Sequence, residues 1–121
     1  RPELLPLCTV DLLGRNGRAS VRAVFDSGAL LPIFPRRAAE DAGVSLPDAP
    51  NFPIQYGGGV EQGRRVRAYI EIRQRRLDVE IVFVERLELP YALLGRRGIF
   101  GYFNEVAFLE KVATPRVELR W

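Results

Sequence analysis

The chain has 121 residues, of which 47% are hydrophobic and 27% charged; this composition is typical of a folded globular protein and excludes a disordered chain. We expect one domain over residues 1–121, large enough to bury a modest core. There is no histidine and one cysteine, which excludes serine–histidine and cysteine–histidine catalysis, multi-cysteine zinc sites and an internal disulfide. We therefore expect no metal and no cofactor, and any acid–base chemistry has to come from carboxylates, Tyr, Lys or Arg.

The net charge of +3 comes almost wholly from arginine, since Lys111 is the only lysine. The arginines are spread along the chain instead of forming one stripe with interleaved aromatic residues, so we do not expect nucleic-acid binding. No apolar run is long enough to cross a bilayer, and the first residues have no signal-peptide pattern. We expect no membrane contact within this segment and a soluble domain, with the cytoplasm favoured. Because the chain begins at Arg1 and not at Met, we expect it to be excised from a longer protein.

Turn signals recur about every 8 to 15 residues, which predicts a mostly-β domain. The first two strands are predicted over 7–13 and 19–25. The Asn16-Gly17 dipeptide between them favours a hairpin, because both residues tolerate a positive φ. Cys8 lies in the first, apolar strand and is expected to be a small core residue.

One short helix is predicted over 35–43, with Pro35 at its first position and Gly43 at its C-terminal cap. A proline-rich connection over 46–53 leads to a glycine-rich hairpin. The remaining predicted elements are strands or short apolar segments over 54–60, 65–73, 77–84, 91–95, 106–109 and 116–121, with a second, poorly formed helix over 96–103.

Asp26-Ser27-Gly28 is the candidate catalytic segment. The aspartate follows directly on an apolar strand, in a turn of small residues where backbone N–H groups can hold a carboxylate ionised. Ser27 offers a hydroxyl that can lock the turn, and Gly28 permits backbone conformations barred to other residues. A plain turn with a structural aspartate is the alternative, because the tripeptide alone is a weak motif.

Two segments together resemble the paired signatures of the retropepsin-like (retroviral-type) aspartic proteases: Phe25-Asp26-Ser27-Gly28-Ala29 and Leu93-Leu94-Gly95-Arg96. In that family the strand bearing the later glycine passes close against the catalytic turn. A glycine-bearing β-hairpin, the flap, lies between the two signatures, and residues 54–63 occupy its place here. The predicted helix over 35–43 is similar to one that bacterial single-domain members carry after the catalytic turn.

The resemblance implies a retropepsin-like acid protease barrel and an aspartic endopeptidase that hydrolyses extended polypeptide substrates. The chemistry needs two carboxylates and the chain has one such motif, so a homodimer is implied, with Asp26 from each chain. The terminal strands are candidates for the dimer sheet, or equally for packing within one subunit. The implied site residues are catalytic Asp26; loop support from Ser27, Gly28 and Ala29; flap and substrate binding by Tyr56, Gly57, Gly58, Gly59 and Val60; and structural packing behind the site by Leu93, Leu94, Gly95 and Arg96.

Two departures from the family pattern keep other functions open. Retroviral members place an acid two residues after the motif glycine, where this chain has Leu30, so Arg96 lacks that partner. Ser27 replaces the commoner threonine, which retains a hydroxyl but loses a methyl group. The main alternative is a catalytically inactive module of the same fold, used for dimerisation or peptide binding. A nucleic-acid-binding β-barrel is a more distant one, supported by the basic charge alone.

Overall fold

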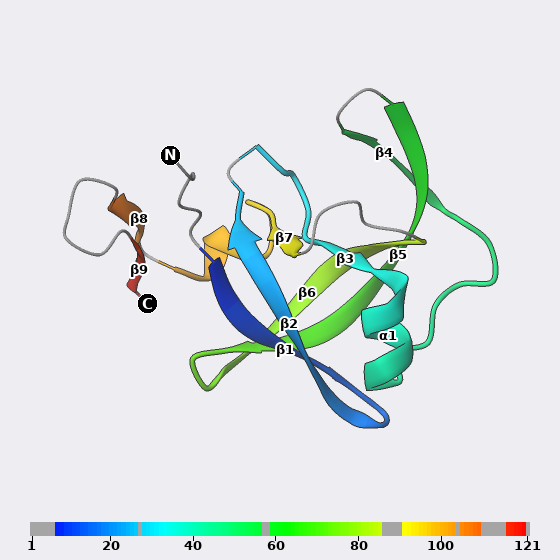
Figure 1. Ribbon diagram of the computed structural model, residues 1–121, viewed down its shortest axis with the longest axis horizontal. Helices are drawn as coiled ribbons and strands as arrows, with labels where there is room; N and C mark the ends of the chain where they lie inside the picture. The colour runs from blue at the N-terminus through cyan, green and yellow to red at the C-terminus, as the bar shows by residue number, and fades with distance from the viewer. Residues whose placement is uncertain are drawn as a thin grey trace.

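The computed structural model describes residues 7–26, 28–56, 59–85, 91–103, 105–109 and 116–120. The chain is built mainly of strands, with one short α-helix (Figure 1). In chain order the elements are β1 (Leu7–Gly14), β2 (Gly17–Phe25), β3 (Ile33–Pro35), α1 (Arg36–Ala42), β4 (Phe52–Tyr56), β5 (Gly59–Ile72), β6 (Arg75–Val84), β7 (Ala92–Leu94), the 3-10 helix η1 (Phe100–Tyr102), β8 (Glu105–Leu109) and β9 (Arg116–Arg120).

Seven strands form one sheet in the order β1-β2-β7-β3-β6-β5-β4. An additional antiparallel pairing of β1 with β5, in which Leu12 lies opposite Ile70, joins two strands that are distant in this order. Because this pairing joins β1, at one end of the sheet, to β5 near the other end, the sheet closes into a barrel. The predicted mostly-β barrel with one short helix after the β2 turn is confirmed.

The barrel interior is filled by residues that alternate along the strands. On β6, Leu77, Val79 and Ile81 are buried, whereas the two residues that alternate with them face outward, as the two-residue period of a strand dictates. Phe25 closes the end of this core, with its ring 5.8 Å from that of Phe100. Burial of the last three residues of β2 fixes the point where the chain leaves the core, one residue before Asp26.

Helix α1 is held against the β1–β2 hairpin. Gly43 ends the helix in the left-handed conformation, with φ 81° and ψ 38°, where glycine carries no steric penalty. Backbone N–H groups of Arg15 and Asn16 in the hairpin turn donate to the carbonyls of Gly43 and Ala42 at 3.1 and 2.9 Å. The turn thus satisfies helix carbonyls that have no partner within the helix. The predicted cap at Gly43 is confirmed.

Pro35 lies one position earlier than predicted, as the extended N-cap residue of α1 and the last residue of β3. The β1–β2 turn also lies earlier, at Arg15-Asn16, and of the Asn16-Gly17 pair only Gly17 has a positive φ. The predicted second helix over 96–103 is reduced to the single turn of η1.

Two strand boundaries differ from the predictions. Strand β4 begins at Phe52, inside the predicted connection, and contains Pro53. This is tolerated because β4 is the edge strand of the sheet, where a missing N–H need not break a ladder. Strand β5 extends back to Gly59, since it pairs with β4 near the hairpin and with β6 further on.

The terminal strands β8 and β9 form a separate two-stranded antiparallel sheet, in which Val106 lies opposite Leu119. Val117 and Leu119 are partly buried and pack against the main core. A role for these strands in a dimer remains a prediction, and Trp121 lies outside the described residues. No helix in the described part of the chain is long and apolar enough to cross a membrane.

Cys8 packs against the core, and burial raises the pKa of its thiol to about 11. A raised pKa means less thiolate at neutral pH, and the thiolate is the reactive form. We expect Cys8 in the folded protein to react with iodoacetamide at pH 8 at least about tenfold more slowly than in urea, and its rate to keep rising up to about pH 11. Quantifying alkylation by mass spectrometry across this range checks the prediction. A rate that levels off near pH 9 would contradict it.

Candidate active site

Asp26 stands at the exit of β2, where the buried residues before it hold the backbone in place. Its own N–H donates to the carbonyl of Leu94 at 3.0 Å, which continues the pairing of β2 with β7. The N–H of Gly28 donates to Asp26 Oδ1 at 2.8 Å, and the N–H of Ala29 donates to the Asp26 carbonyl at 3.2 Å. Asp26 is half-buried, and its carboxylate is oriented by its own turn. Ser27 lies outside the described residues.

Strand β7 passes between β2 and β3 and closes over this turn. It pairs in parallel with β2, placing Leu93 opposite Val24, and antiparallel with β3, placing Leu93 opposite Ile33. Just after β7, the N–H groups of Arg96 and Arg97 donate to the carbonyls of Ala29 and Leu30 at 3.0 and 2.8 Å. The loop that carries Asp26 is therefore tied at both ends to the β7 segment.

Gly95 lies at the point of closest approach between these segments. A Cβ atom built on it would lie 2.5 Å from the carbonyl carbon of Leu31 and 2.6 Å from its oxygen, well inside van der Waals contact. No side chain fits there without moving backbone. Glycine at this position is thus a condition for the two segments to cross.

A cavity of about 350 Å³ opens beside the Asp26 carboxylate. The loop after β2, the start of β3, the base of the β4–β5 hairpin and the ends of β6 and β7 form its walls. Its lining is Asp26, Gly28, Ala29, Leu30, Leu31, Ile33, Phe52, Pro53, Ile54, Val82 and Leu93. Asp26 carries the single charge among these side chains, so the cavity presents one carboxylate in an apolar setting.

The residues predicted to lie behind the site divide between two environments. Leu94 is fully buried in the main core. Leu93 is half-buried, packs against a second, smaller core cluster and lines the cavity with Asp26. The Arg96 side chain is exposed and makes no ion pair with the described residues, in keeping with Leu30 at the position where an acid would pair with it.

The predicted flap is the β4–β5 hairpin, which rises at the same edge of the barrel as the loop after β2 (Figure 1). In its ladder Tyr56 lies opposite Gly59, and Val60 is 64% exposed. Gly57 and Gly58, at the predicted tip, lie outside the described residues. The hairpin residues that reach the cavity are at its base, Phe52 to Ile54.

Sequence reasoning missed most of the cavity wall. Leu31, Ile33 and Val82 belong to segments whose pattern is that of ordinary core, and the prolines near the base of the hairpin predict a connection there. The alternation of Phe52 and Ile54 around Pro53 was the available signal for a strand. Nothing in the sequence signals that Val82 and Asp26 line one cavity, because that arrangement depends on the parallel pairing of β3 with β6.

Polar contacts anchor the base of the hairpin. The Asn51 side chain accepts from the Arg65 N–H at 2.7 Å and donates to the Arg65 carbonyl at 3.2 Å. Arg64 Nε donates to the Pro47 carbonyl at 2.9 Å, and Arg64 Nη1 lies 2.7 Å from Glu85 Oε1. Arg64 therefore ties the incoming connection and the end of β6 to β5.

Glu85 accepts hydrogen bonds from Arg36 and Arg64, which lower its pKa below the ordinary value of 4.5. Because the pKa of Glu85 is lower in the folded protein, its bonds to the two arginines stabilise the fold fully above pH 4.5. This stabilisation is lost as the pH falls through the pKa that Glu85 has in the folded protein. The anchor should thus persist under mildly acid conditions.

We expect Arg64→Met to lower the free energy of unfolding by about 1–2 kcal/mol. The Arg64 side chain is only 13% exposed, and its loss would leave the Pro47 carbonyl without this hydrogen-bond donor. The matched control is Arg67→Met on the same strand, whose side chain is 62% exposed and pairs with Asp78. Its expected cost is below about 0.5 kcal/mol. Urea unfolding of both variants checks the difference, and equal costs would contradict the anchoring role.

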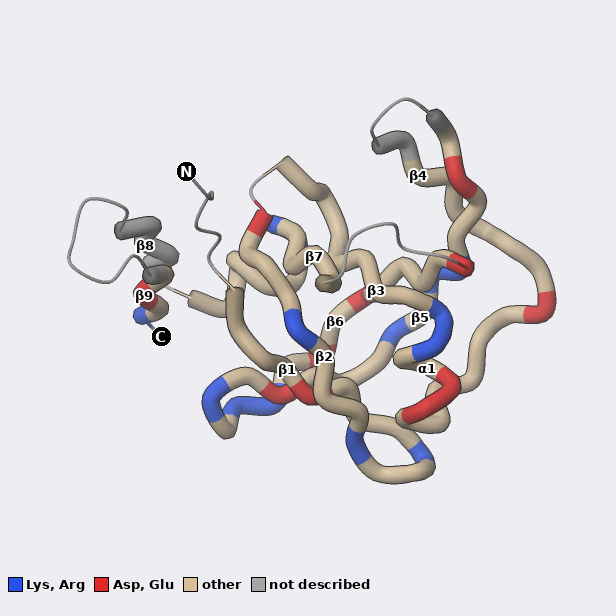
Figure 2. Tube along the Cα trace, viewed as in Figure 1, with Lys and Arg blue, Asp and Glu red and all other residues tan. Residues whose placement is uncertain are grey.

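Charged residues are distributed over the strands and hairpin ends, with acidic and basic residues interspersed (Figure 2). On β5 and β6, for instance, Arg65 pairs with Glu80 and Arg67 with Asp78. No group of three or more His, Cys, Asp or Glu that could hold a metal occurs in the described ranges. The candidate chemistry at this site is that of the Asp26 carboxylate.

No family model matches this chain, and no curated protein matches it. Among the solved structures it is similar to EIAV protease complexed with the inhibitor HBY-793, with a TM-score of 0.65 and 16% sequence identity. The match covers 83% of this chain and 89% of that chain. A likeness at this identity concerns the fold. The retropepsin-like fold implied by the two sequence signatures is confirmed by it.

Proposed function

We propose that this chain is one subunit of a homodimeric aspartic endopeptidase that hydrolyses peptide bonds in extended polypeptides. The observation that carries the proposal is the Asp26 carboxylate, oriented by the Gly28 N–H and facing a cavity of about 350 Å³. The similarity of the fold to EIAV protease supports the same function. Helix α1, which follows the Asp26 loop and the short strand β3, favours the bacterial-type single-domain members.

The proposal requires a second copy of the chain. Asp26 is the one acid among the residues that line the cavity, whereas the reaction needs a base and an acid at the same bond. A two-fold axis beside Asp26 would bring the same residue of the partner into reach. Two carboxylates at such a distance share one proton, because both do not ionise together.

The chemistry follows from that shared proton. The ionised Asp26 takes a proton from a water, whose oxygen attacks the scissile carbonyl carbon, while the partner's Asp26 gives its proton to the carbonyl oxygen. The tetrahedral intermediate then collapses: the C–N bond breaks as the proton taken from water passes from Asp26 to the leaving nitrogen, and one hydroxyl of the intermediate returns a proton to the partner's Asp26 as the carboxyl C=O forms. Each product ends with its proton count balanced, and the carboxylate pair returns to its singly protonated state.

The other site residues have supporting roles in this proposal. Ser27, Gly28 and Ala29 fix the catalytic loop, and Gly95 allows the β7 segment to cross behind it, with Leu94 in the core and Arg96 on the loop through its N–H. Residues Tyr56 to Val60 cover the bound peptide, offering backbone hydrogen bonds and excluding water. The apolar cavity walls, including Leu93, would receive a substrate side chain.

An inactive dimerisation or peptide-binding module is the second candidate function. Leu30 favours it, because this side chain is 49% exposed where the retroviral pattern has an acid, and Arg96 makes no ion pair in the described part of the chain. Incubating the dimer with a broad peptide library from about pH 3 to pH 7, with and without a pepstatin-type inhibitor, separates the two. Inhibitor-sensitive cleavage at mildly acid pH supports the protease; a folded dimer that cleaves nothing supports the module.

A further inference from the structure

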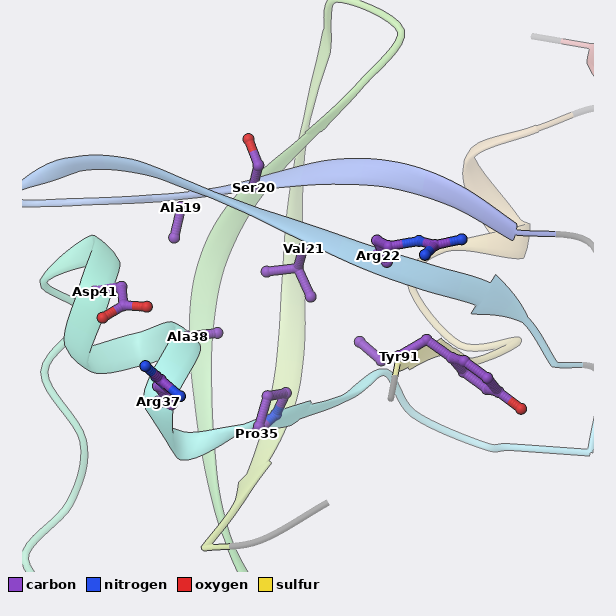
Figure 3. Close-up of a pocket in the computed structure, with 10 residues that line it drawn as sticks. Ala19, Ser20, Val21, Arg22, Pro35, Arg37, Ala38, Asp41 and Tyr91 are labelled. Carbon is purple, nitrogen blue, oxygen red and sulfur yellow. The ribbon is translucent and has the colours of Figure 1, made fainter. Parts of the chain in front are cut away.

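A second cavity, of about 330 Å³, lies between β2, α1 and the start of β7 (Figure 3). It shares no lining residue with the cavity beside Asp26, although the same strands β3 and β7 contribute to both. The residues that line it are Ala19, Ser20, Val21, Arg22, Pro35, Arg37, Ala38, Asp41, Tyr91 and Ala92. The function proposed above makes no use of it.

Small apolar side chains leave the hollow open. Ala19 projects from β2 toward α1, and Ala38 faces it from the helix (Figure 3). Ala38 and Ala92 are buried, and Val21 and Pro35 complete an apolar floor. A larger residue at Ala19 would fill this space. The hollow has the size and polarity to take one aliphatic side chain.

Among the described residues, one edge of β2 is unpaired beside the hollow. Strand β2 pairs with β1 along its whole length, but with β7 only over residues 23–25. The Asp26 N–H points to β7, and the two-residue period of a strand then directs the backbone groups of Ser20 and Arg22 to the same side. In the described part of the chain no strand pairs with them. An open strand edge is a template for an added strand.

Polar side chains surround the hollow with an asymmetric charge. Arg22 lies toward Tyr91 at one end, and Asp41 and Arg37 lie near each other on the helix at the other end (Figure 3). Neither arginine makes an ion pair with the described residues, and the Ser20 hydroxyl is already donated to Asp11 Oδ1 at 2.8 Å. The Arg22 end is therefore complementary to a carboxylate.

We propose that this cavity is a docking site for an extended peptide segment that adds to β2 at Ser20 and Arg22. An aliphatic side chain of the segment occupies the hollow over Ala38 and Ala92. An acidic side chain further along lies at the Arg22 end. The site is separate from the Asp26 cavity, and the inference stands whether or not the chain is a protease.

The test uses a fluorescein-labelled octapeptide of threonines with a central leucine and a glutamate three residues away, which places the two side chains on opposite faces of a strand, as Ala19 and Arg22 are on β2. The protein carries Asp26→Asn so that the probe stays intact. We expect backbone amide shifts at 19–22 and 37–41, and a Kd below about 1 mM by fluorescence anisotropy. Shifts confined to 26–31 and 52–54 would place the peptide in the other cavity and overturn the proposal, as would the absence of binding.

Three changes separate the parts of the site. Ala19→Leu should weaken binding at least about tenfold by filling the hollow, and N-methylation of the probe's central backbone should do the same. Arg22→Glu should weaken the glutamate probe about tenfold and strengthen a lysine-substituted probe. Arg15→Glu, on the nearby hairpin turn outside the cavity, is the matched control for charge. If Arg15→Glu weakens the glutamate probe as much as Arg22→Glu does, attraction is non-specific and the proposal fails.

Discussion

Replacement of Asp26 by Asn is expected to abolish peptide cleavage, with a loss of at least about a thousandfold, while the protein stays folded. The side-chain amide oxygen of the variant can still accept the Gly28 N–H, which in the wild type donates to Asp26 Oδ1 at 2.8 Å. An amide neither takes a proton from water nor gives one to a carbonyl. Catalysis should therefore be lost while the conformation of the turn is retained.

Two measurements make this prediction specific. Cleavage is followed by mass spectrometry of a peptide library, and thermal unfolding of both proteins shows whether the fold is retained. Asp48→Asn is the control, since Asp48 lies on the connection after α1 and is not among the residues that line the cavity. It should leave cleavage unchanged. Activity that survives Asp26→Asn would remove this residue from the chemistry.

Replacement of Gly95 by Ala is expected to lower the free energy of unfolding by at least about 3 kcal/mol, or to prevent folding. The added Cβ would lie 2.5 Å from the Leu31 carbonyl carbon, and both sides of the contact are backbone next to strand pairings. A flexible side chain could move aside, whereas here β7 would have to separate from the Asp26 loop. The cost should therefore be large.

Gly101→Ala is the matched control for this substitution. A Cβ at Gly101 meets nothing within 4 Å, and its φ is not positive. We expect a change below about 0.5 kcal/mol there, measured by urea unfolding alongside Gly95→Ala. Similar midpoints for the two variants would show that β7 does not pass the loop as closely as described.

The sequence predicted those elements whose signals are local. Strands β5 and β6 alternate over many residues, and α1 has a glycine in the left-handed conformation at its end. The Asp26 turn could be found because it follows an apolar strand directly. The prediction that the segment with Gly95 crosses this turn rested on the resemblance to a family, since no local pattern indicates which distant strand crosses a turn.

Elements that depend on distant partners were missed. Strand β3 has three residues, too few to show a period, and exists because β6 and β7 pair with it on either side. Strand β4 was predicted from residue 54 onward, and its first two residues were hidden by Pro53, which an edge position tolerates. The cavity walls at Val82 and Ile33 follow from these pairings. Both cavities are therefore consequences of topology and not of any motif.

A mixing experiment shows whether the active site combines Asp26 from two chains. Wild-type protein and Asp26→Asn are co-refolded at equal amounts and fixed total concentration, so that subunits combine at random. If one site needs both carboxylates, only wild-type pairs cleave, and activity falls to about one quarter of that of the wild type alone. Activity of about one half would mean that each chain acts by itself, and would contradict an active site shared between two chains.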